Sequence, residues 1–188
     1  MKKGEFGYLQ KKRAFSLLKS FFLLAAVVVV YYAALRHYQT NKNVFTILAA
    51  VGALPAGRSV VISVMLLRAR SASADVRDAV LNVKGLSRDC SGYDICLTTE
   101  EKAFSLSHAA AGNGRLAGLT EDPAMDCAMC EKYILHTLDG AGLEGYSVRI
   151  YRDLREYIRA LEELETSPDH DDRETDRKAM QLLYAVSL

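Results

Sequence analysis

Long uninterrupted apolar runs dominate the first third of the chain. Residues 21–35 read FFLLAAVVVVYYAAL without a charge, and Leu17 and Leu18 extend this run backward past Lys19. Residues 44–67 form a second apolar run that carries one charge, Arg58. Because a helix needs roughly 20 apolar residues to cross a bilayer core, the pattern predicts membrane-spanning helices at residues 17–35 and 44–67, joined by an external loop at residues 36–43.

The short distance between the two runs favours a retained hairpin. A cleaved signal peptide, or a signal anchor followed by an interfacial helix, also has a basic start and an apolar centre. A second long apolar run after so short a polar loop is typical of a stop-transfer pattern, which such segments lack. We therefore expect a membrane hairpin.

Basic residues lie on the two flanks of the hairpin that lead to the chain ends. The N-terminal segment, residues 1–16, holds five Lys or Arg, the loop holds two, and residues 68–84 hold four. Lys and Arg accumulate on the cytoplasmic side of membrane proteins. The sequence therefore predicts a multi-pass protein of the cell membrane with both termini cytoplasmic, whose basic flanks attract anionic lipids.

The second run has an unusual centre, LPAGRS at residues 54–59. Pro55 removes a backbone donor and Gly57 relaxes the helix, so we expect a kink. A charge within a span is a functional-site hypothesis by default, which makes Arg58 the intramembrane polar candidate. Three structural interpretations compete with it: Arg58 snorkels, the helix is shorter, broken or re-entrant, or Arg58 pairs in a homo-oligomer whose small residues pack closely.

Short mixed elements replace the apolar runs beyond residue 68. The spacing of apolar and turn residues predicts a cytoplasmic α/β domain at residues 68–166, followed by an acidic linker and a C-terminal helix at residues 167–188. The fold class is α+β, in the order α-β-β-β-α-β-α. The expected helices are residues 73–82, 122–138 and 153–165 with a last one from about 174, and the expected strands are residues 93–98, 103–108, 115–119 and 146–151.

Three local expectations belong to this domain. Tyr93, Ile95 and Leu97 should share one face of the first strand, because alternate residues of a strand point the same way. Asp122 followed by proline should begin a helix. The turn at residues 112–114, GNG, should close a hairpin. The final helix either packs on the domain or offers a groove-binding face to a protein partner.

Charge is distributed unevenly along the chain. The formal charge is +7 over residues 1–43, +3 over residues 44–84 and −9 over residues 85–188, so the net value of +1 hides a basic front and an acidic back. An acidic domain repels the phosphates of nucleic acid. We therefore expect no nucleic-acid partner.

Four cysteines supply the candidate chemistry. Cys127 and Cys130 form a C-x-x-C, which is typical of zinc and thiol redox sites, and Cys90 or Cys96 would have to complete a zinc site. With Cys127 expected about one turn inside its helix, the two cysteines also continue an apolar stripe, so buried packing competes with a metal site. The histidines are scattered, and none completes a catalytic constellation.

The order of elements resembles the core of the restriction-endonuclease-like superfamily. Members of that superfamily hold a metal ion with a strand acid and an (Asp/Glu)-x-Lys on the next strand. Asp94 and Glu100-Glu101-Lys102 imitate these pieces, but Glu100 and Lys102 fall in the turn before the second strand and the third strand has neither acid nor lysine. The resemblance therefore implies an endonuclease-like core without its active-site pattern.

Nearly the whole chain resembles a family of small uncharacterised two-span membrane proteins of Gram-positive bacteria. The similar segments are the start MKKGEFGYL, the centre PAGRS, the run YDICLTTEEKAFSL and the C-terminal YRDLREYIRALEEL. This resemblance implies the architecture and no catalytic residue. The predicted function is an integral membrane protein presenting a cytoplasmic binding or regulatory module, with a membrane-anchored enzyme or a zinc or thiol site at the C-x-x-C as the alternative.

Overall fold

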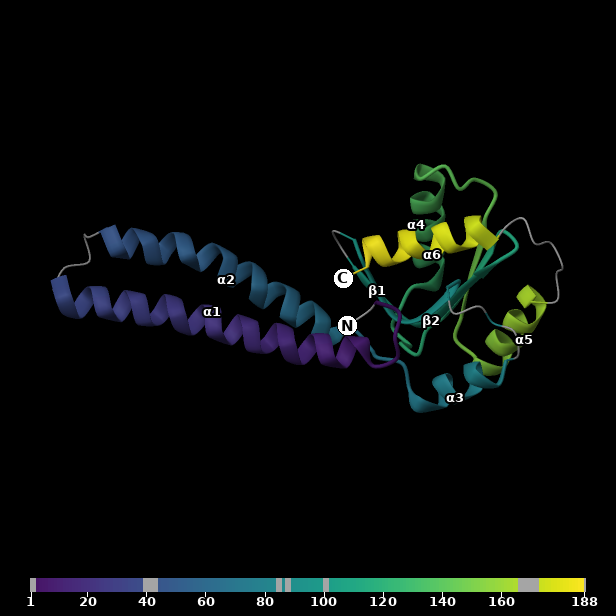
Figure 1. The fold of residues 1–188 in the computed structure, drawn as a ribbon, viewed down its shortest axis with the longest axis horizontal. Helices are drawn as coiled ribbons and strands as arrows, with labels where there is room; N and C mark the ends of the chain where they lie inside the picture. Colours follow the sequence, from purple (N-terminus) through teal and green to yellow (C-terminus); the bar gives the residue numbers. More distant parts are fainter. Residues whose placement is uncertain are drawn as a thin grey trace. The chain divides into compact units, whose positions relative to one another are not determined.

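A computed structural model describes residues 3–38, 44–83, 86, 89–99, 102–165 and 173–187. The chain divides into two compact units (Figure 1). One unit is the helical hairpin, Gln10–Arg68. The other combines the N-terminal segment up to Leu9 with everything from Ala69 onward.

The hairpin consists of α1, Tyr8–Tyr38, and α2, Val44–Arg68. Both contain stretches long and apolar enough to cross a membrane, at Tyr8–Ala33 and Ala50–Leu67. The helix α1 begins nine residues before the predicted span, because the basic stretch before that span also consists of good helix formers. The helix α2 runs through Pro55 without interruption, so the alternative of a broken segment was wrong. A re-entrant placement stays a prediction. The kink stays a prediction.

Serine hydroxyls link the two helices of the hairpin. Ser20 bonds to both Ser59 and Ser63 at 2.8 Å, and Ser16 bonds to Ser63 at the same distance. Small hydroxyl side chains let helix backbones approach closely and satisfy one another without charge. The hairpin is therefore held together in a way that suits an apolar surrounding.

The second unit is an α+β domain built on a four-stranded mixed sheet in the order β1-β2-β3-β4. Neighbouring strands pair antiparallel, antiparallel and then parallel. The predicted order of elements is confirmed. The strands are β1, Ser91–Thr98, β2, Ala103–Gly112, β3, Arg115–Leu119, and β4, Ser147–Tyr151, and the helices are α3, Ala74–Asn82, α4, Cys127–Gly140, α5, Leu154–Glu165, and α6, Arg173–Val186.

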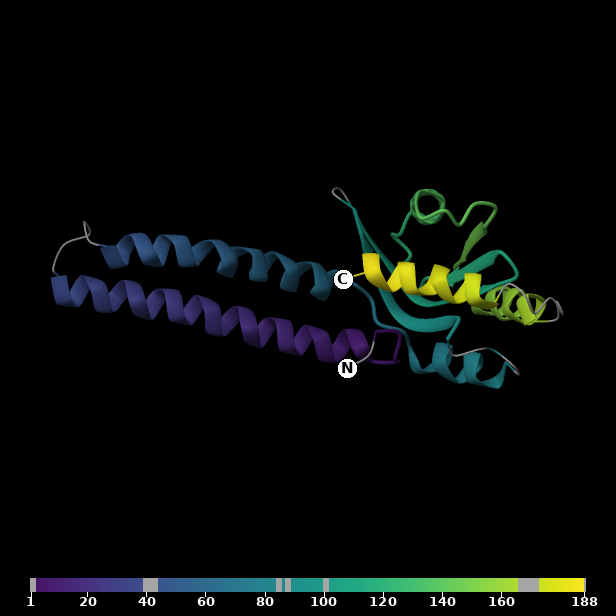
Figure 2. The ribbon, with the colours of Figure 1, turned by 45° about the horizontal axis from the view of Figure 1, so that its top comes forward.

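Helices cover both faces of this sheet (Figure 2). The helices α4 and α6 enclose the larger apolar cluster, which includes Phe104, Leu106, Ile134 and Met180. The helices α3 and α5 enclose the smaller cluster around Tyr157. The C-terminal helix therefore packs on the domain, so the first of its two predicted roles is correct.

The β2–β3 hairpin is confirmed, with β2 four residues longer than predicted. Asn113 and Gly114 have φ values of 52° and 67°. Positive φ at both central residues defines the type I′ turn that matches strand twist. The three alanines before this turn lie beyond the predicted end of the strand, but they continue it and are buried between the two helix layers.

Two sequence predictions in this domain were wrong. Tyr93 packs in the α3–α5 cluster, whereas Ile95 and Leu97 pack in the other, because Asp94 between them has a φ of 57° and breaks the alternation of the strand. The helix α4 begins at Cys127 rather than at Asp122, whose carboxylate instead accepts from the Ala124 amide in a turn.

Candidate functional site

The C-x-x-C motif lies at the start of α4. Asp126 caps this helix through the Met129 amide, so Cys127 is its first residue. The prediction that Cys127 lies about one turn inside the helix was therefore wrong. Cys130 is fully buried in the apolar cluster beside Ile134, and burial raises the pKa of its thiol to about 12. Cys130 is therefore a packed, protonated thiol at neutral pH.

No group of three or more His, Cys, Asp or Glu that could hold a metal ion occurs within the described ranges. Cys90 and Cys96, predicted as further zinc ligands, are buried. The structure thus adds no support to the zinc and redox interpretations of Cys127 and Cys130, which stay predictions. Arg58, the other candidate, is an exposed residue of the hairpin, while its neighbour Ser59 is buried against α1.

Asp94, which imitates a nuclease acid, has a structural task. Its buried carboxylate accepts from the amides of Ala72 and Leu9, at 2.8 and 3.2 Å, and from the Ser71 hydroxyl at 3.0 Å. Lys102 lies in the β1–β2 turn, as expected, and Glu100 falls outside the described residues. Asp94 therefore fastens Leu9, near the start of α1, and the segment that follows α2 to the sheet.

A second carboxylate reinforces this attachment. Glu121 accepts from the Ser107 hydroxyl at 2.8 Å and from the Ser73 amide at 3.0 Å. Ser105 exchanges two hydrogen bonds with the backbone of Arg70. The segment that leads from α2 into α3 is therefore fixed on the sheet before α3 begins.

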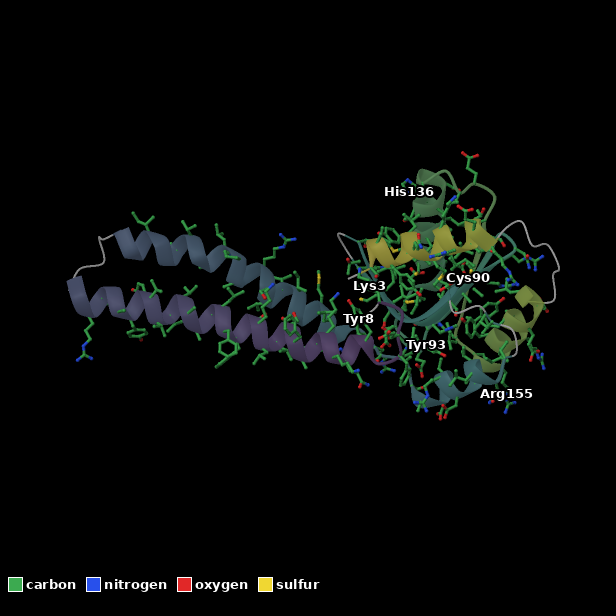
Figure 3. All side chains as sticks on the ribbon, in the orientation of Figure 1. Lys3, Tyr8, Cys90, Tyr93, His136 and Arg155 are labelled. Carbon is green, nitrogen blue, oxygen red and sulfur yellow. The ribbon has the colours of Figure 1, made fainter. Side chains whose placement is uncertain are left out.

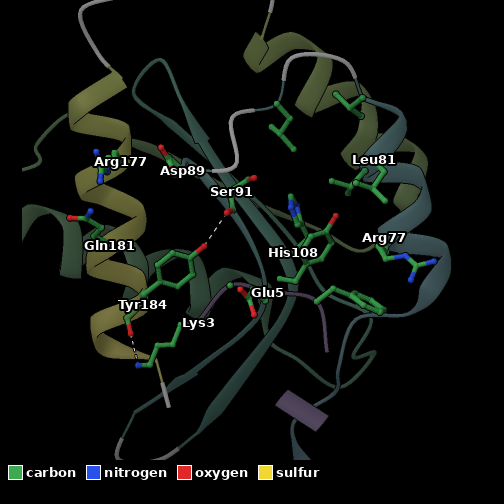
Figure 4. Close-up of a pocket in the computed structure, with 16 residues that line it drawn as sticks. Lys3, Glu5, Arg77, Leu81, Asp89, Ser91, His108, Arg177, Gln181 and Tyr184 are labelled. Atoms are coloured by element: carbon green, nitrogen blue, oxygen red, sulfur yellow. Dashed lines mark hydrogen bonds between the residues drawn. The ribbon is translucent and has the colours of Figure 1, made fainter. Parts of the chain in front are cut away.

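Between α3, α6 and the edge strand β1 lies a cavity of about 820 Å³, drawn in Figure 4. This volume falls within the range of small-molecule sites, about 300–1,000 Å³. Its walls come from four parts of the chain: the N-terminal segment, α3 with the residues that follow it, the β1–β2 sheet, and α6. Lys3 and Tyr93, labelled in Figure 3, belong to two of these walls.

The N-terminal segment forms one wall by pairing with β1. The Tyr93 amide donates to the Gly4 carbonyl at 3.0 Å, and the Phe6 ring meets the Tyr93 ring edge-on at 5.8 Å. Lys3 Nζ donates to two carbonyls at the end of α6, where a cation is favourable. Gly92 permits the close approach of α6, because a Cβ there would lie 1.8 Å from the Tyr184 hydroxyl.

His108 is the buried polar residue of this cavity. Its Nδ1 lies 2.6 Å from the Tyr157 hydroxyl, and its ring lies 4.5 Å from the Tyr93 ring. Burial lowers the pKa of its imidazole to about 3, so the ring is neutral at physiological pH. Nε2 is buried and has no hydrogen-bond partner among the described residues. Unpartnered buried polar atoms are rare in native proteins, and this one is enclosed in the fold beside the cavity.

Sequence reasoning missed this site. His108 was grouped with scattered histidines, of which His136 is exposed on α4 (Figure 3) and His170 lies outside the described residues. Tyr157, which holds the ring, is 49 residues away in the chain. A histidine within an apolar run, SLSHAAAG, was the available signal. Comparisons of the chain with protein-family models, curated proteins and solved structures give no match.

Proposed function

We propose that this chain is a two-span protein of the cell membrane whose α+β domain, on the cytoplasmic side, binds a small molecule in the His108 cavity. The two long apolar helices and the basic residues on their outer flanks support the membrane placement. The order of elements resembles that of a restriction-endonuclease-like core, but Asp94, the acid of that resemblance, is taken up by structural hydrogen bonds. The proposed activity is therefore binding.

The observation that carries the proposal is the cavity of about 820 Å³ beside the buried His108 imidazole, whose Nε2 has no partner among the described residues. A buried polar atom without a partner is unfavourable by about 1–3 kcal/mol. The other candidates among the described residues, the buried thiol of Cys130 and the exposed ring of His136, do not line this cavity.

The connectivity of the chain suggests why a membrane protein has this cavity. Phe6 lines it and α1 begins at Tyr8, while the α3 wall begins at Ala74, six residues after α2 ends at Arg68. The cavity walls are therefore continuous in sequence with both membrane helices. A regulatory role, in which a cytoplasmic ligand alters the hairpin, follows from this continuity.

Two experiments test the proposal. A C-terminal fusion to green fluorescent protein should fluoresce, and one to alkaline phosphatase should stay inactive; the opposite pair of results would overturn the orientation. For binding, the full chain in phospholipid nanodiscs is dialysed against benzoylglycinamide, a neutral aromatic amide, with empty nanodiscs as the blank.

The binding test needs a variant that blocks the cavity. Gln181→Trp places an indole in it from the exposed face of α6, whereas Ala185→Trp places the same indole one turn further on, outside the lining. Saturable binding should disappear in the first variant and persist in the second. Absence of saturable binding to the native chain, or equal binding by the Gln181→Trp variant, would contradict a small-molecule cavity.

A further inference from the structure

Arg58 is an exposed charge within an apolar face of α2. Exposed aliphatic side chains continue on both sides of it along the helix, with Leu54 toward one end and Val61 and Leu67 toward the other. If Arg58 marked the edge of the membrane, the side chains from Val61 to Leu67 would lie in water, at a cost that grows with their apolar area. The apolar surface of α2 therefore extends past Arg58 in both directions.

The depth of Arg58 follows from the membrane placement proposed above, on which this inference rests; the cavity plays no part in it. Arg58 stands ten residues before the end of α2 at Arg68 and fourteen residues after its start at Val44. At about 1.5 Å per residue, these intervals are about 15 Å and about 21 Å, against an apolar core of about 30 Å. Neither membrane surface is close to this side chain.

Lys19 is a second charge at the same level of the hairpin, but it leans the other way. Ser20 and Ser59, the residues that follow Lys19 and Arg58, bond to each other at 2.8 Å. Helical side chains lean toward the N-terminus of their own helix. For Lys19 that direction leads to the proposed cytoplasmic surface, where an ammonium reaches the headgroups. For Arg58 it leads toward the farther surface, which opposes snorkelling.

The chain itself offers Arg58 no counter-charge. Arg58 forms no hydrogen bond or ion pair with any residue that the structure describes. Between Glu5 and Asp75 the sequence contains no Asp or Glu, so neither this hairpin nor that of a second copy supplies a carboxylate at this depth. Charged side chains within membranes pair with one another or line a polar cavity. The counter-charge therefore has to come from outside this chain.

The surface beside Arg58 has room for a neighbouring helix. Ala53 and Gly57 are exposed on α2, and a Cβ at Gly57 would meet nothing within 4 Å. Small residues let the backbones of two membrane helices approach closely. A guanidinium forms two parallel hydrogen bonds with one carboxylate. A helix with an acidic residue at the depth of Arg58 fits both features.

We propose that α2 pairs in the membrane with an apolar helix of a second protein that carries one Asp or Glu near its centre. The carboxylate accepts hydrogen bonds from the Arg58 guanidinium, and the two charges offset each other in the apolar core. The partner helix packs over the exposed Ala53 and Gly57. An apolar helix with an uncharged residue at the same place lacks this attraction.

Three synthetic transmembrane peptides test the pairing. Each is a leucine–alanine helix with a dansyl group at one end and Glu, Gln or Leu at its centre. The chain has no tryptophan, so Tyr31→Trp gives it a single fluorescence donor on the exposed surface of α1. Energy transfer from this donor to dansyl is measured with the full chain in phosphatidylcholine vesicles, and the Leu peptide gives the transfer that arises from random encounters. The Glu peptide should reach half-maximal transfer at an about tenfold lower peptide-to-lipid ratio than the Gln peptide, because hydrogen bonds between ions are stronger.

Two substitutions assign the preference to its residue. Arg58→Leu removes the charge from the apolar face, so the Glu peptide should then give no more transfer than the Gln peptide. Lys19→Leu removes a charge at the same level that is directed toward the headgroups, so the preference for the Glu peptide should remain. A preference that survives in Arg58→Leu, or disappears in Lys19→Leu, would contradict the assignment to Arg58.

The remaining outcomes separate the partner helix from other occupants. If the three peptides give equal transfer while the chain resists extraction by alkaline carbonate, the partner helix is wrong and the membrane placement is not. If carbonate extracts the chain, the membrane placement fails as well. Lipid phosphate occupies Arg58 if equal parts of phosphatidylglycerol abolish the preference for the Glu peptide. A second copy occupies it if the chain alone forms dimers that Arg58→Leu separates, and either result would overturn the proposal.

Discussion

The pair of His108 and Tyr157 yields a stability prediction that runs against the usual effect of core substitutions. In the ligand-free protein, Nε2 is unsatisfied, which is unfavourable by about 1–3 kcal/mol, while the bond from Tyr157 to Nδ1 contributes about 0.5–1.5 kcal/mol. Both rings are fully buried, so solvent does not replace a lost partner. The stability of each variant therefore depends on how many buried polar atoms it leaves unpaired.

Three variants differ in that number. Tyr157→Phe leaves both imidazole nitrogens unpaired and should lower the free energy of unfolding by about 1–3 kcal/mol. His108→Phe removes the orphan Nε2 but creates an orphan Tyr157 hydroxyl, so it should change stability by less than about 1 kcal/mol. The double variant leaves none unpaired, and it should be at least as stable as the native chain, by up to about 2 kcal/mol.

The assay is thermal unfolding of the full chain in nanodiscs, followed by near-ultraviolet circular dichroism. A change of 1 kcal/mol corresponds to a midpoint shift of about 4 °C for a domain of this size. Tyr133→Phe is the control, because its hydroxyl forms no hydrogen bond with a described residue. A double variant no more stable than Tyr157→Phe would refute the reasoning that an unpaired Nε2 destabilises this site.

Three further predictions concern the same domain. The pKa of His108 is lowered in the folded protein, so the unfolded chain takes up a proton at this residue first as the pH falls. The stability that the neutral imidazole contributes is therefore complete above pH 6.5 and is lost toward pH 3, by up to about 1.4 kcal/mol per pH unit. Urea titrations of the native chain and of His108→Phe should diverge in this window, and parallel curves would contradict the prediction. Asp94→Ala should lower the unfolding midpoint more than Asp94→Asn, because asparagine tolerates positive φ and keeps one acceptor. Equal midpoints would argue against the role of the Asp94 carboxylate in holding these segments on the sheet. Iodoacetamide followed by mass spectrometry should label Cys127 well before Cys130, whose thiol is buried and whose pKa is raised to about 12; equal labelling would count against the packing interpretation.

Most of the fold follows from local patterns in the sequence. The two apolar runs, the GNG turn and the amphipathic α5 depend on neighbouring residues alone, and all of them appear in the structure. Of the predicted apolar stripe of α4, Cys130, Ile134 and Leu138 are fully buried, whereas Cys127 is half-buried. Periodicity is a reliable guide here because each element buries one face.

The errors arose where tertiary contacts override local preference. Asp122 followed by proline satisfies the sequence rule for a helix start, but Asp126 caps the helix instead. The conformation of Asp94 is set by three donors from the segments that flank the hairpin, and no pattern within β1 indicates it. The two faces of β1 were therefore assigned wrongly.

The His108 cavity could not have been predicted, because it forms only when distant segments meet. Phe6, Arg77 and Tyr184 line it from three different segments of the chain. Tyr157 fixes the imidazole from α5 without lining the cavity itself. Each residue alone has an ordinary structural interpretation, and the unpaired nitrogen is visible only in the assembled fold.

Nitrogen-15 solid-state NMR of the full chain in phospholipid bilayers, with labelled histidine, tests the central claim most directly. The chain has four histidines, and the His108→Phe variant assigns the signal. Because the buried Tyr157 hydroxyl donates to Nδ1, the account predicts a neutral His108 from pH 5 to pH 8 with the hydrogen on Nε2. A hydrogen on Nδ1, or protonation within this pH range, would contradict it.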